Sequence, residues 1–193
     1  MRGASILLAL VLAGSTPAPL ERARDHSGLP VIGPAPNFVL RAQDGTSVAL
    51  DQLRGKVVAI TFIFTSCSAT CPVLTAKMAA VQDRLAGDFG SKIVFLSITV
   101  DPEHDKPEVL QRYSQAFGAN PAGWKFLTGA PGTIRTVERL SGVFASSLSD
   151  GDLDHTNLTS IVDTQGMLRV QYLGVRFDPD EFRKDLESLV ESS

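Results

Sequence analysis

Two cysteines, Cys67 and Cys71, are the residues of this chain whose type and spacing are best suited to chemistry, and they are its only cysteines. Three residues separate them, at the point where an apolar run, 57–64, gives way to Pro72 and a helical pattern. Unpaired N–H groups and the positive end of the helix dipole favour thiolate over thiol near a helix N-terminus. Because thiolates attack disulfides and bind soft metals, the pair predicts either thiol exchange or metal binding.

Pro72 predicts how the two cysteines are held. Its ring fits the first turn of a helix and biases the residue before it away from helical geometry, so we expect a tight loop from Cys67 to Cys71. A spacing of four positions in a turn can bring two Cα atoms to within about 4.4–6.8 Å, the range that a disulfide needs. Reversible oxidation is therefore open to the pair. A purely structural disulfide is the alternative, although closing so short a loop would stabilise the fold little.

The elements that must position the cysteines alternate along the chain. Two runs rich in β-branched residues, 57–64 and 93–100, are typical of strands buried on both faces. Asp44-Gly45 and Gln165-Gly166 indicate the turns of two hairpins, and the remaining pattern predicts a strand at 124–129 and helices over 72–85, 107–117, 131–143 and 179–190. The helix at 131–143 carries Ile134, Val137 and Leu140 as its apolar residues. This order predicts a mainly parallel sheet covered by helices: an α/β single domain with a thioredoxin-like fold, an N-terminal β-hairpin and an inserted C-terminal β-hairpin.

The N-terminal residues are typical of a secretory leader. Arg2, the apolar run 6–13 and the small residues after it have the order of a signal peptide, and the run is shorter than the about 20 apolar residues of a membrane helix. We expect residues 1–18 to be a signal peptide or an uncleaved anchor, 19–33 a flexible linker containing an exposed His26, and 34–193 the thioredoxin-like domain. The mature protein is then periplasmic, or secreted across the inner membrane, and works in an oxidising compartment.

Composition sets broad limits on the function. The chain has 193 residues, of which 44% are apolar and 20% charged, enough for one domain with a substantial core. A net charge of −3 without a basic cluster gives no footprint for nucleic acid.

His155, before the closing hairpin, is the third candidate. If the fold is thioredoxin-like, its loop faces the cysteine loop, and two thiolates and an imidazole converge into a set that suits Cu(I) and can also hold Cu(II). Asp101, at a strand end, and Asp154, beside His155, are candidates for orienting a ligand, although a surface role fits each as well. His104 is interpreted as part of a solvated turn and Met78 as a core side chain.

Four segments carry a resemblance to a known family: Phe62-Ile63-Phe64-Thr65-Ser66-Cys67 with Cys71-Pro72, Ser97-Ile98-Thr99-Val100-Asp101-Pro102-Glu103, Gly123-Trp124-Lys125-Phe126-Leu127-Thr128-Gly129, and Asp154-His155-Thr156. With these, the chain resembles the Sco/SenC family of copper-binding, cytochrome c oxidase assembly proteins over about residues 33–189. The resemblance implies Cys67, Cys71 and His155 as the metal ligands, copper as the bound metal, and a thioredoxin-like fold. It also implies subunit II of the oxidase as the partner, with another periplasmic copper chaperone as a further one, and hence work close to the membrane.

The expected function is therefore that of a copper chaperone for the copper site of oxidase subunit II. The alternative is a thiol-disulfide oxidoreductase, with Cys67 and Cys71 as redox-active thiols that keep cysteines of the oxidase or other periplasmic targets reduced. Redox turnover without bound metal would distinguish the two. A peroxide-scavenging relative of peroxiredoxins shares the fold class, but the three-residue spacing and His155 suit a metal better than peroxide.

Overall fold

The elements are those of a computed structural model, which describes residues 28–147 and 153–192. The strands are β1 (Gly33–Pro34), β2 (Val39–Ala42), β3 (Ser47–Ala49), β4 (Val57–Ile63), β5 (Ile93–Thr99), β6 (Trp124–Thr128), β7 (Ala145–Ser147), β8 (Leu153–His155), β9 (Leu158–Val162) and β10 (Met167–Leu173). The α-helices are α1 (Thr70–Arg84), α2 (Pro107–Ala116), α3 (Pro131–Ser141) and α4 (Pro179–Glu191), and two short 3₁₀ helices are η1 (Leu50–Leu53) and η2 (Ala86–Asp88).

One eight-stranded sheet organises the molecule, in the order β1-β10-β9-β4-β5-β6-β2-β3. In the described chain, β5 is parallel to β4 and to β6, and every other pair in this sheet is antiparallel. The prediction of a mainly parallel sheet is therefore wrong. Both hairpins extend the parallel centre by antiparallel pairing, the N-terminal one from β2 onto β6 and the C-terminal one from β9 onto β4.

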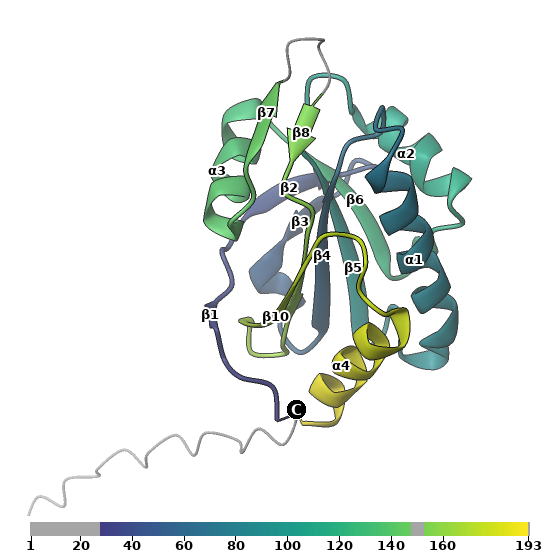
Figure 1. The fold of residues 1–193 in the computed structure, drawn as a ribbon, viewed down its shortest axis with the longest axis vertical. Helices are drawn as coiled ribbons and strands as arrows, with labels where there is room; N and C mark the ends of the chain where they lie inside the picture. Colours follow the sequence, from purple (N-terminus) through teal and green to yellow (C-terminus); the bar gives the residue numbers. More distant parts are fainter. Residues whose placement is uncertain (1–27, 148–152, 193) are drawn as a thin grey trace, which may run out of the picture.

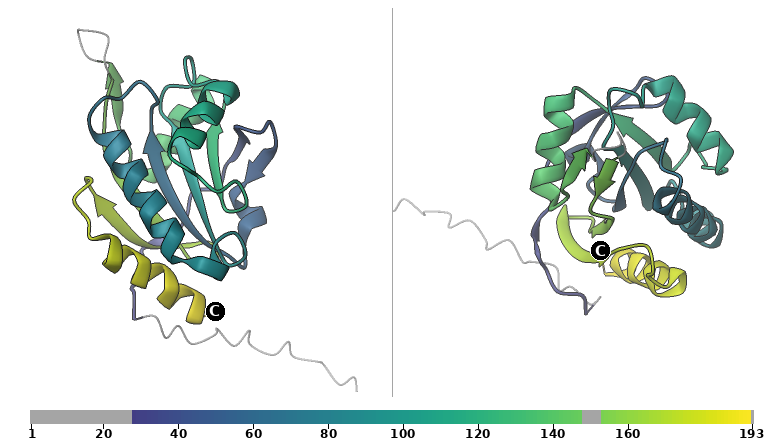
Figure 2. Two further views of the ribbon diagram at one scale, coloured as in Figure 1. Left: turned by 90° about the vertical axis from the view of Figure 1, so that its right-hand side faces the viewer. Right: turned by 45° about the horizontal axis from the view of Figure 1, so that its top comes forward.

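Helices cover both faces of this sheet. The crossovers from β4 through α1 to β5, and from β5 through α2 to β6, connect parallel neighbours in the same direction, and right-handed crossovers then place both helices on one face. Figures 1 and 2 show α1, α2 and α4 on that face and α3 on the other. The α/β class and the thioredoxin-like arrangement predicted from the sequence are confirmed.

The core lies around β4 and β5, in which all residues are buried. Aromatic rings extend it: Phe95 packs edge-on against Trp124, which stacks on Phe126. The indole N–H of Trp124 donates to Ser97 Oγ at 3.0 Å, so the ring is buried with its donor satisfied.

The two predicted hairpins are confirmed, β2–β3 and β9–β10. Gly45 and Gly166 adopt φ of +82° and +79°, left-handed values that glycine adopts without strain, which explains why glycine occupies these turn positions. The Asp44 carboxylate also accepts from the Thr46 N–H at 3.0 Å, which closes the first turn.

The start of α1 differs from the expectation. The helix begins at Thr70, so Cys71 lies inside its first turn rather than in a loop before it. The N–H groups of a first turn have no intrahelical acceptor, so Pro72 costs no hydrogen bond there. The steric bias that Pro72 places on Cys71 is outweighed by the complete burial of Cys71 and by its N–H, which points at Cys67 Sγ.

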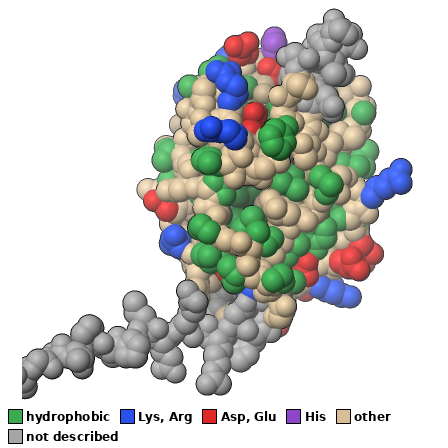
Figure 3. Space-filling view, turned by 60° about the vertical axis from the view of Figure 1, so that its left-hand side comes forward, with side chains coloured by type: hydrophobic (Ala, Val, Ile, Leu, Met, Phe, Trp, Pro, Cys, Tyr) green, Lys and Arg blue, Asp and Glu red, His purple; other side chains and the backbone are tan. Residues whose placement is uncertain are grey.

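The apolar stripe of α3 also differs from the predicted one. Ile134 and Val137 are buried, but Leu140 is 57% exposed and Glu138 is buried in its place. The α3 side of the molecule is rich in exposed apolar groups, and Figure 3 shows hydrophobic side chains spread over that side with charged ones mostly toward its edges. A cavity of about 240 Å³ lies there, between α3, β1 and the sheet.

Residues before β1 run along β10. The Ile32 N–H donates to the Leu168 carbonyl at 2.9 Å, and the Arg169 guanidinium donates to the carbonyls of Leu29 and Pro30. The leader predicted for residues 1–18, and His26, lie outside the described residues. No helix within residues 28–147 and 153–192 is both long enough and apolar enough to cross a membrane.

Candidate metal centre

The predicted site residues come from three elements that meet at one end of the sheet. Cys67 follows β4, Cys71 lies in the first turn of α1, and His155 is the last residue of β8. Figure 1 shows the β4–α1 connection and β8 at the same end of the fold. β8 was not predicted, because two three-residue strands separated by a loop give no detectable alternation. It pairs with β7 so that His155 lies opposite Ala145.

The structure brings Cys71 and His155 together. Cys71 Sγ lies 3.6 Å from His155 Nε2, although 84 positions separate the residues in the chain. His155 Nδ1 lies 3.1 Å from the Thr156 carbonyl, which can only accept, so Nδ1 carries the hydrogen and Nε2 faces the sulfur with its lone pair. This tautomer is the one that a ligand binding through Nε2 requires.

The separation of these two atoms suits a shared metal. A metal bound at about 2.3 Å from a thiolate and about 2.0 Å from an imidazole nitrogen, at a tetrahedral angle, holds the two donors about 3.5 Å apart. His155 is 7% exposed and meets the Phe64 ring edge-on at 5.6 Å between centroids, so the imidazole is held by packing as well as by its hydrogen bond. The donor set of two sulfurs and one nitrogen is soft and suits copper.

Cys67 is the accessible member of the pair. It is partly exposed, and the N–H of Cys71 lies 3.4 Å from its sulfur. Partial burial opposes ionisation, but the N–H groups of Cys71 and Ala69, with the Cys71 thiol and the Thr70 hydroxyl, outweigh it and lower the pKa of Cys67 below its ordinary value. Cys67 is therefore the better nucleophile of the two.

Cys71 is the buried member. Burial chiefly, with the hydrogen bond and charge of Cys67, raises its pKa to about 12, against an opposing N–H from Phe64. Both cysteines are free thiols. Across the described residues, no three Cys, His, Asp or Glu side chains are assembled as a metal site.

Asp105 is a residue at this centre that sequence reasoning missed. Its carboxylate is 1% exposed and accepts from the Thr65 N–H at 3.0 Å, from the Thr65 hydroxyl, and from the Thr99 hydroxyl at 2.5 Å. These bonds tie the segment after β5 to the segment that leads into Cys67. Asp105 therefore positions the cysteine loop. In the sequence, Asp105 comes after threonines near the ends of two strands, Thr65 and Thr99. A solvated acidic turn would show the same pattern, so nothing marked this carboxylate as buried.

The remaining candidates lie around this centre. Both carboxylate oxygens of Asp101 are 2.9 Å from His104 Nδ1, and the His104 side chain is 80% exposed, as expected for a solvated turn. Asp101 thus contacts His104, and an orienting role toward a metal ligand stays a prediction. The side chain of Asp154 lies outside what the structure describes, and Met78 packs in the core at 1% exposure.

A half-exposed thiol and a buried thiol at a strand–helix junction, on a thioredoxin-like fold and faced by a histidine, define a protein of the thioredoxin class with a potential metal-binding site. A family model described as SCO1/SenC matches residues 32–191. This chain belongs to the SCO1/SenC family.

Individual relatives agree with this assignment. The chain is 30% identical over 155 residues to a SCO1 protein homolog of Bacillus subtilis, an alignment that covers 78% of this chain and 80% of that protein. It is 34% identical over 125 residues to a mitochondrial SCO1 homolog of Arabidopsis thaliana, covering 65% of this chain but 36% of that longer protein.

Solved structures agree as well. ScoI of Bradyrhizobium japonicum, determined with copper bound, superposes with a TM-score of 0.71 at 30% identity, covering 80% of this chain and 98% of ScoI. A SCO1/SenC family lipoprotein of Bacillus anthracis gives a TM-score of 0.74 at 27% identity over 81% of this chain and 95% of that one. BsSco, described as having a disulfide switch and as a member of the Sco family of cytochrome c oxidase assembly proteins, also gives 0.74, at 28% identity over 84% and 97% of the two chains.

Proposed function

We propose that this protein is a copper chaperone that binds copper through Cys67, Cys71 and His155 and passes it to the copper site of cytochrome c oxidase subunit II. The observation that carries the proposal is the 3.6 Å approach of Cys71 Sγ to His155 Nε2, with Nδ1 tied to a backbone carbonyl. The copper bound to the related ScoI and the oxidase assembly role stated for the Sco family support it.

The unequal exposure of the two sulfurs suits a carrier. Cys67 is partly exposed, whereas Cys71 and His155 are buried, so an acceptor meets Cys67 first. An acceptor thiolate can then replace one ligand at a time while copper keeps the others. Because the thiolates and the imidazole must lose their protons to bind, affinity should fall as pH falls.

Copper loading of the reduced protein tests the ligand set. We expect Cu(II) added anaerobically to give intense thiolate-to-copper absorption bands and a paramagnetic resonance spectrum showing sulfur and nitrogen ligands. Replacing either cysteine with serine should abolish tight binding, and His155→Ala should alter the Cu(II) spectrum and weaken Cu(II) more than Cu(I). His104→Ala removes an exposed histidine near the site and is the matched control. A His155→Ala protein that keeps the wild-type spectrum and Cu(II) affinity contradicts the assignment.

A second candidate function is reduction of disulfides in the oxidase or in other periplasmic targets. It is favoured by the lowered pKa of the accessible Cys67 beside the buried Cys71. The Cys67 thiolate would attack a target disulfide, and Cys71, after losing its proton, would displace the target's sulfur. The target gains two electrons, and Cys67–Cys71 becomes a disulfide. Turnover of a disulfide substrate by metal-free protein, retained in His155→Ala but lost in Cys67→Ser, would support this candidate over copper delivery.

The proposed site of action is the periplasm, close to the membrane that holds the oxidase. We assign residues 1–18 to the leader or anchor, 19–33 to a linker whose last residues lie along β10, and 34–193 to the copper-binding domain. A lipoprotein among the structural relatives supports membrane proximity. Mass spectrometry of the protein from a periplasmic fraction would distinguish a cleaved leader from a retained anchor.

A further inference from the structure

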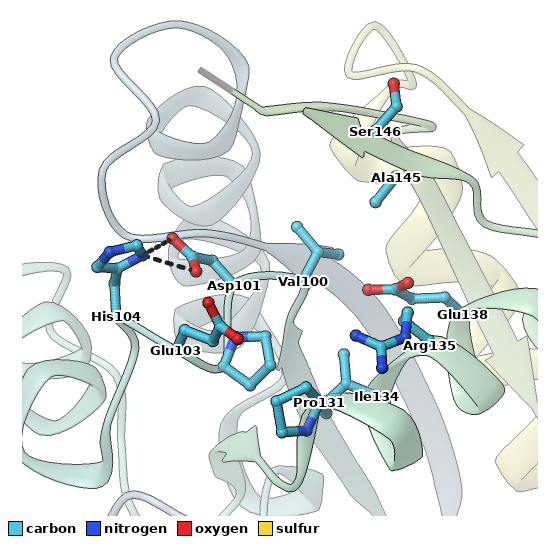
Figure 4. A pocket seen from close by; sticks show the side chains of 11 residues that line it. Val100, Asp101, Glu103, His104, Pro131, Ile134, Arg135, Glu138, Ala145 and Ser146 are labelled. Atoms are coloured by element: carbon cyan, nitrogen blue, oxygen red, sulfur yellow. Dashed lines mark hydrogen bonds and ion pairs between the residues drawn. The ribbon is translucent and has the colours of Figure 1, made fainter. Parts of the chain in front are cut away.

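A pocket of about 310 Å³ lies beside the candidate metal centre, between the segment after β5, helix α3 and strand β7. Figure 4 shows its two kinds of lining. Val100, Pro131 and Ile134 provide apolar surface, and the ionisable side chains are Asp101, Glu103, His104, Arg135 and Glu138. The pocket reaches Ala145 in β7, which lies opposite His155 in β8. One strand therefore separates the pocket from His155, the proposed metal ligand.

Glu138 is the unusual member of this lining. The residue is 6% exposed, its Oε1 is fully buried, and that oxygen has no hydrogen-bond partner among the described residues. Figure 4 shows the carboxyl group directed from α3 toward Val100, into the pocket. Burial raises the pKa of Glu138, and the charge of Arg135 opposes that rise only in part. A buried carboxyl oxygen without a hydrogen-bond partner is costly, and its cost falls when a donor enters.

The other charges determine which kind of donor fits. Asp101, Glu103 and Glu138 carry three carboxyl groups, against one guanidinium at Arg135. His104 is engaged by Asp101, whose hydrogen bond chiefly raises the pKa of the imidazole. Arg135 is exposed and lies one helical turn before Glu138, so it stands at the mouth of the pocket rather than in its floor. With His104 and Asp101 counted as a pair, Glu103 and Glu138 still outnumber Arg135, so the balance favours a cation.

We propose that this pocket receives a lysine or arginine side chain presented by a partner protein. The aliphatic stem would pack on Val100, Pro131 and Ile134, and the cationic head would donate to the Glu138 carboxylate. Seated there, the side chain would hold the partner's chain one strand away from His155. A role of this pocket in copper exchange rests on the proposed function. Its binding of a cationic side chain does not depend on that function.

A small probe tests the binding chemistry directly. Nα-acetyl-arginine N-methylamide is titrated into the full chain, reduced and metal-free, and amide chemical shifts are followed by NMR. Nα-acetyl-citrulline N-methylamide, which has the same shape without the charge, is the neutral probe. We expect saturable shifts confined to residues 100–104 and 134–146 with the arginine probe, and binding at least about tenfold weaker with the citrulline probe.

Three variants test the proposal, because it predicts a different change in the affinity for the arginine probe in each. Glu138→Gln should weaken the arginine probe about tenfold, because it removes the charge that receives the cation. Arg135→Gln should tighten it about two- to fivefold, because it removes a repelling charge at the mouth. Glu191→Gln, an equal loss of charge at the far end of α4, should leave it unchanged.

The outcomes separate this proposal from the proposed function. Equal affinity of wild type and Glu138→Gln for the arginine probe, or equal binding of the two probes, overturns the pocket assignment whatever the copper result. Tighter binding of free arginine than of the capped probe also overturns it, because that indicates a small-molecule site. Probe binding that survives in Cys67→Ser, which cannot hold copper tightly, supports the pocket even where copper delivery fails.

Discussion

Asp105 should matter more to this fold and its cysteine loop than any other carboxylate in the segment after β5. Replacing it with alanine leaves three donors without an acceptor in a region where the residue is 1% exposed: the Thr65 N–H and hydroxyl, and the Thr99 hydroxyl. Replacing it with asparagine keeps one acceptor oxygen but turns an amide N–H₂ toward the remaining donors. The two substitutions therefore remove graded amounts of the same interaction.

The magnitude follows from those contacts. A hydrogen bond to a charged group contributes about 1.5–3 kcal/mol, and breaking a buried charged network by removing one member costs about 3–5 kcal/mol, less than the sum of its parts. We expect Asp105→Ala to lower the free energy of unfolding by about 3–5 kcal/mol and Asp105→Asn by about 1–3 kcal/mol. Because Thr65 lies two residues before Cys67, we also expect copper affinity to fall about 10- to 100-fold in Asp105→Asn.

Urea unfolding followed by circular dichroism measures the first effect, and competition with a chelator measures the second. Asp101→Asn is the matched control for stability, since its carboxylate contacts the exposed His104 and its loss should change the free energy of unfolding by less than about 1 kcal/mol. If Asp105→Asn proved as stable as Asp101→Asn and bound copper as tightly as the wild-type protein, the positioning role assigned to Asp105 would be refuted.

Two further predictions concern packing and reactivity. Gly123→Ala should lower the free energy of unfolding by about 1–3 kcal/mol, because a Cβ there would lie 2.7 Å from the backbone nitrogen of Gly90. Gly87→Ala is the control, because its Cβ would have no atom within 4 Å and should leave stability unchanged. Thermal unfolding of the two variants measures the difference. Iodoacetamide should alkylate Cys67 well before Cys71, with a rate that rises at a lower pH than for an ordinary cysteine, since the pKa of Cys67 is lowered and that of Cys71 is raised to about 12. Peptide mass mapping checks the order, and equal modification of both thiols would contradict it.

Much of the fold was predictable where a local pattern carries the information. The strands β4 and β5 are buried along their whole length, so their unbroken apolar runs indicated them directly. Gly45 and Gly166 need left-handed backbone, so the turns of both hairpins were evident. The direction of strand pairing was not, because it depends on which sheet edge each hairpin joins, and no residue within a hairpin records that choice.

The candidate site divides in the same way. The cysteines were predictable because they follow a buried strand and precede a helix. Their different exposure was not, since it depends on where α1 begins, and Cys71 is drawn into the first turn against the preference that Pro72 imposes on it. His155 was predicted to face them, yet the strand that holds it there is three residues long and gave no signal.

Two acidic residues show why a sequence understates polar groups that shape a site. Asp105 follows other acidic residues and Glu138 lies on an amphipathic helix, so both look like solvated carboxylates, yet they are 1% and 6% exposed. Their surroundings then differ: Asp105 accepts three hydrogen bonds, whereas Glu138 Oε1 accepts none from the described residues. The hydrogen bonds that Asp105 accepts within its own chain explain its burial. The burial of Glu138 is explained when its partner comes from another molecule.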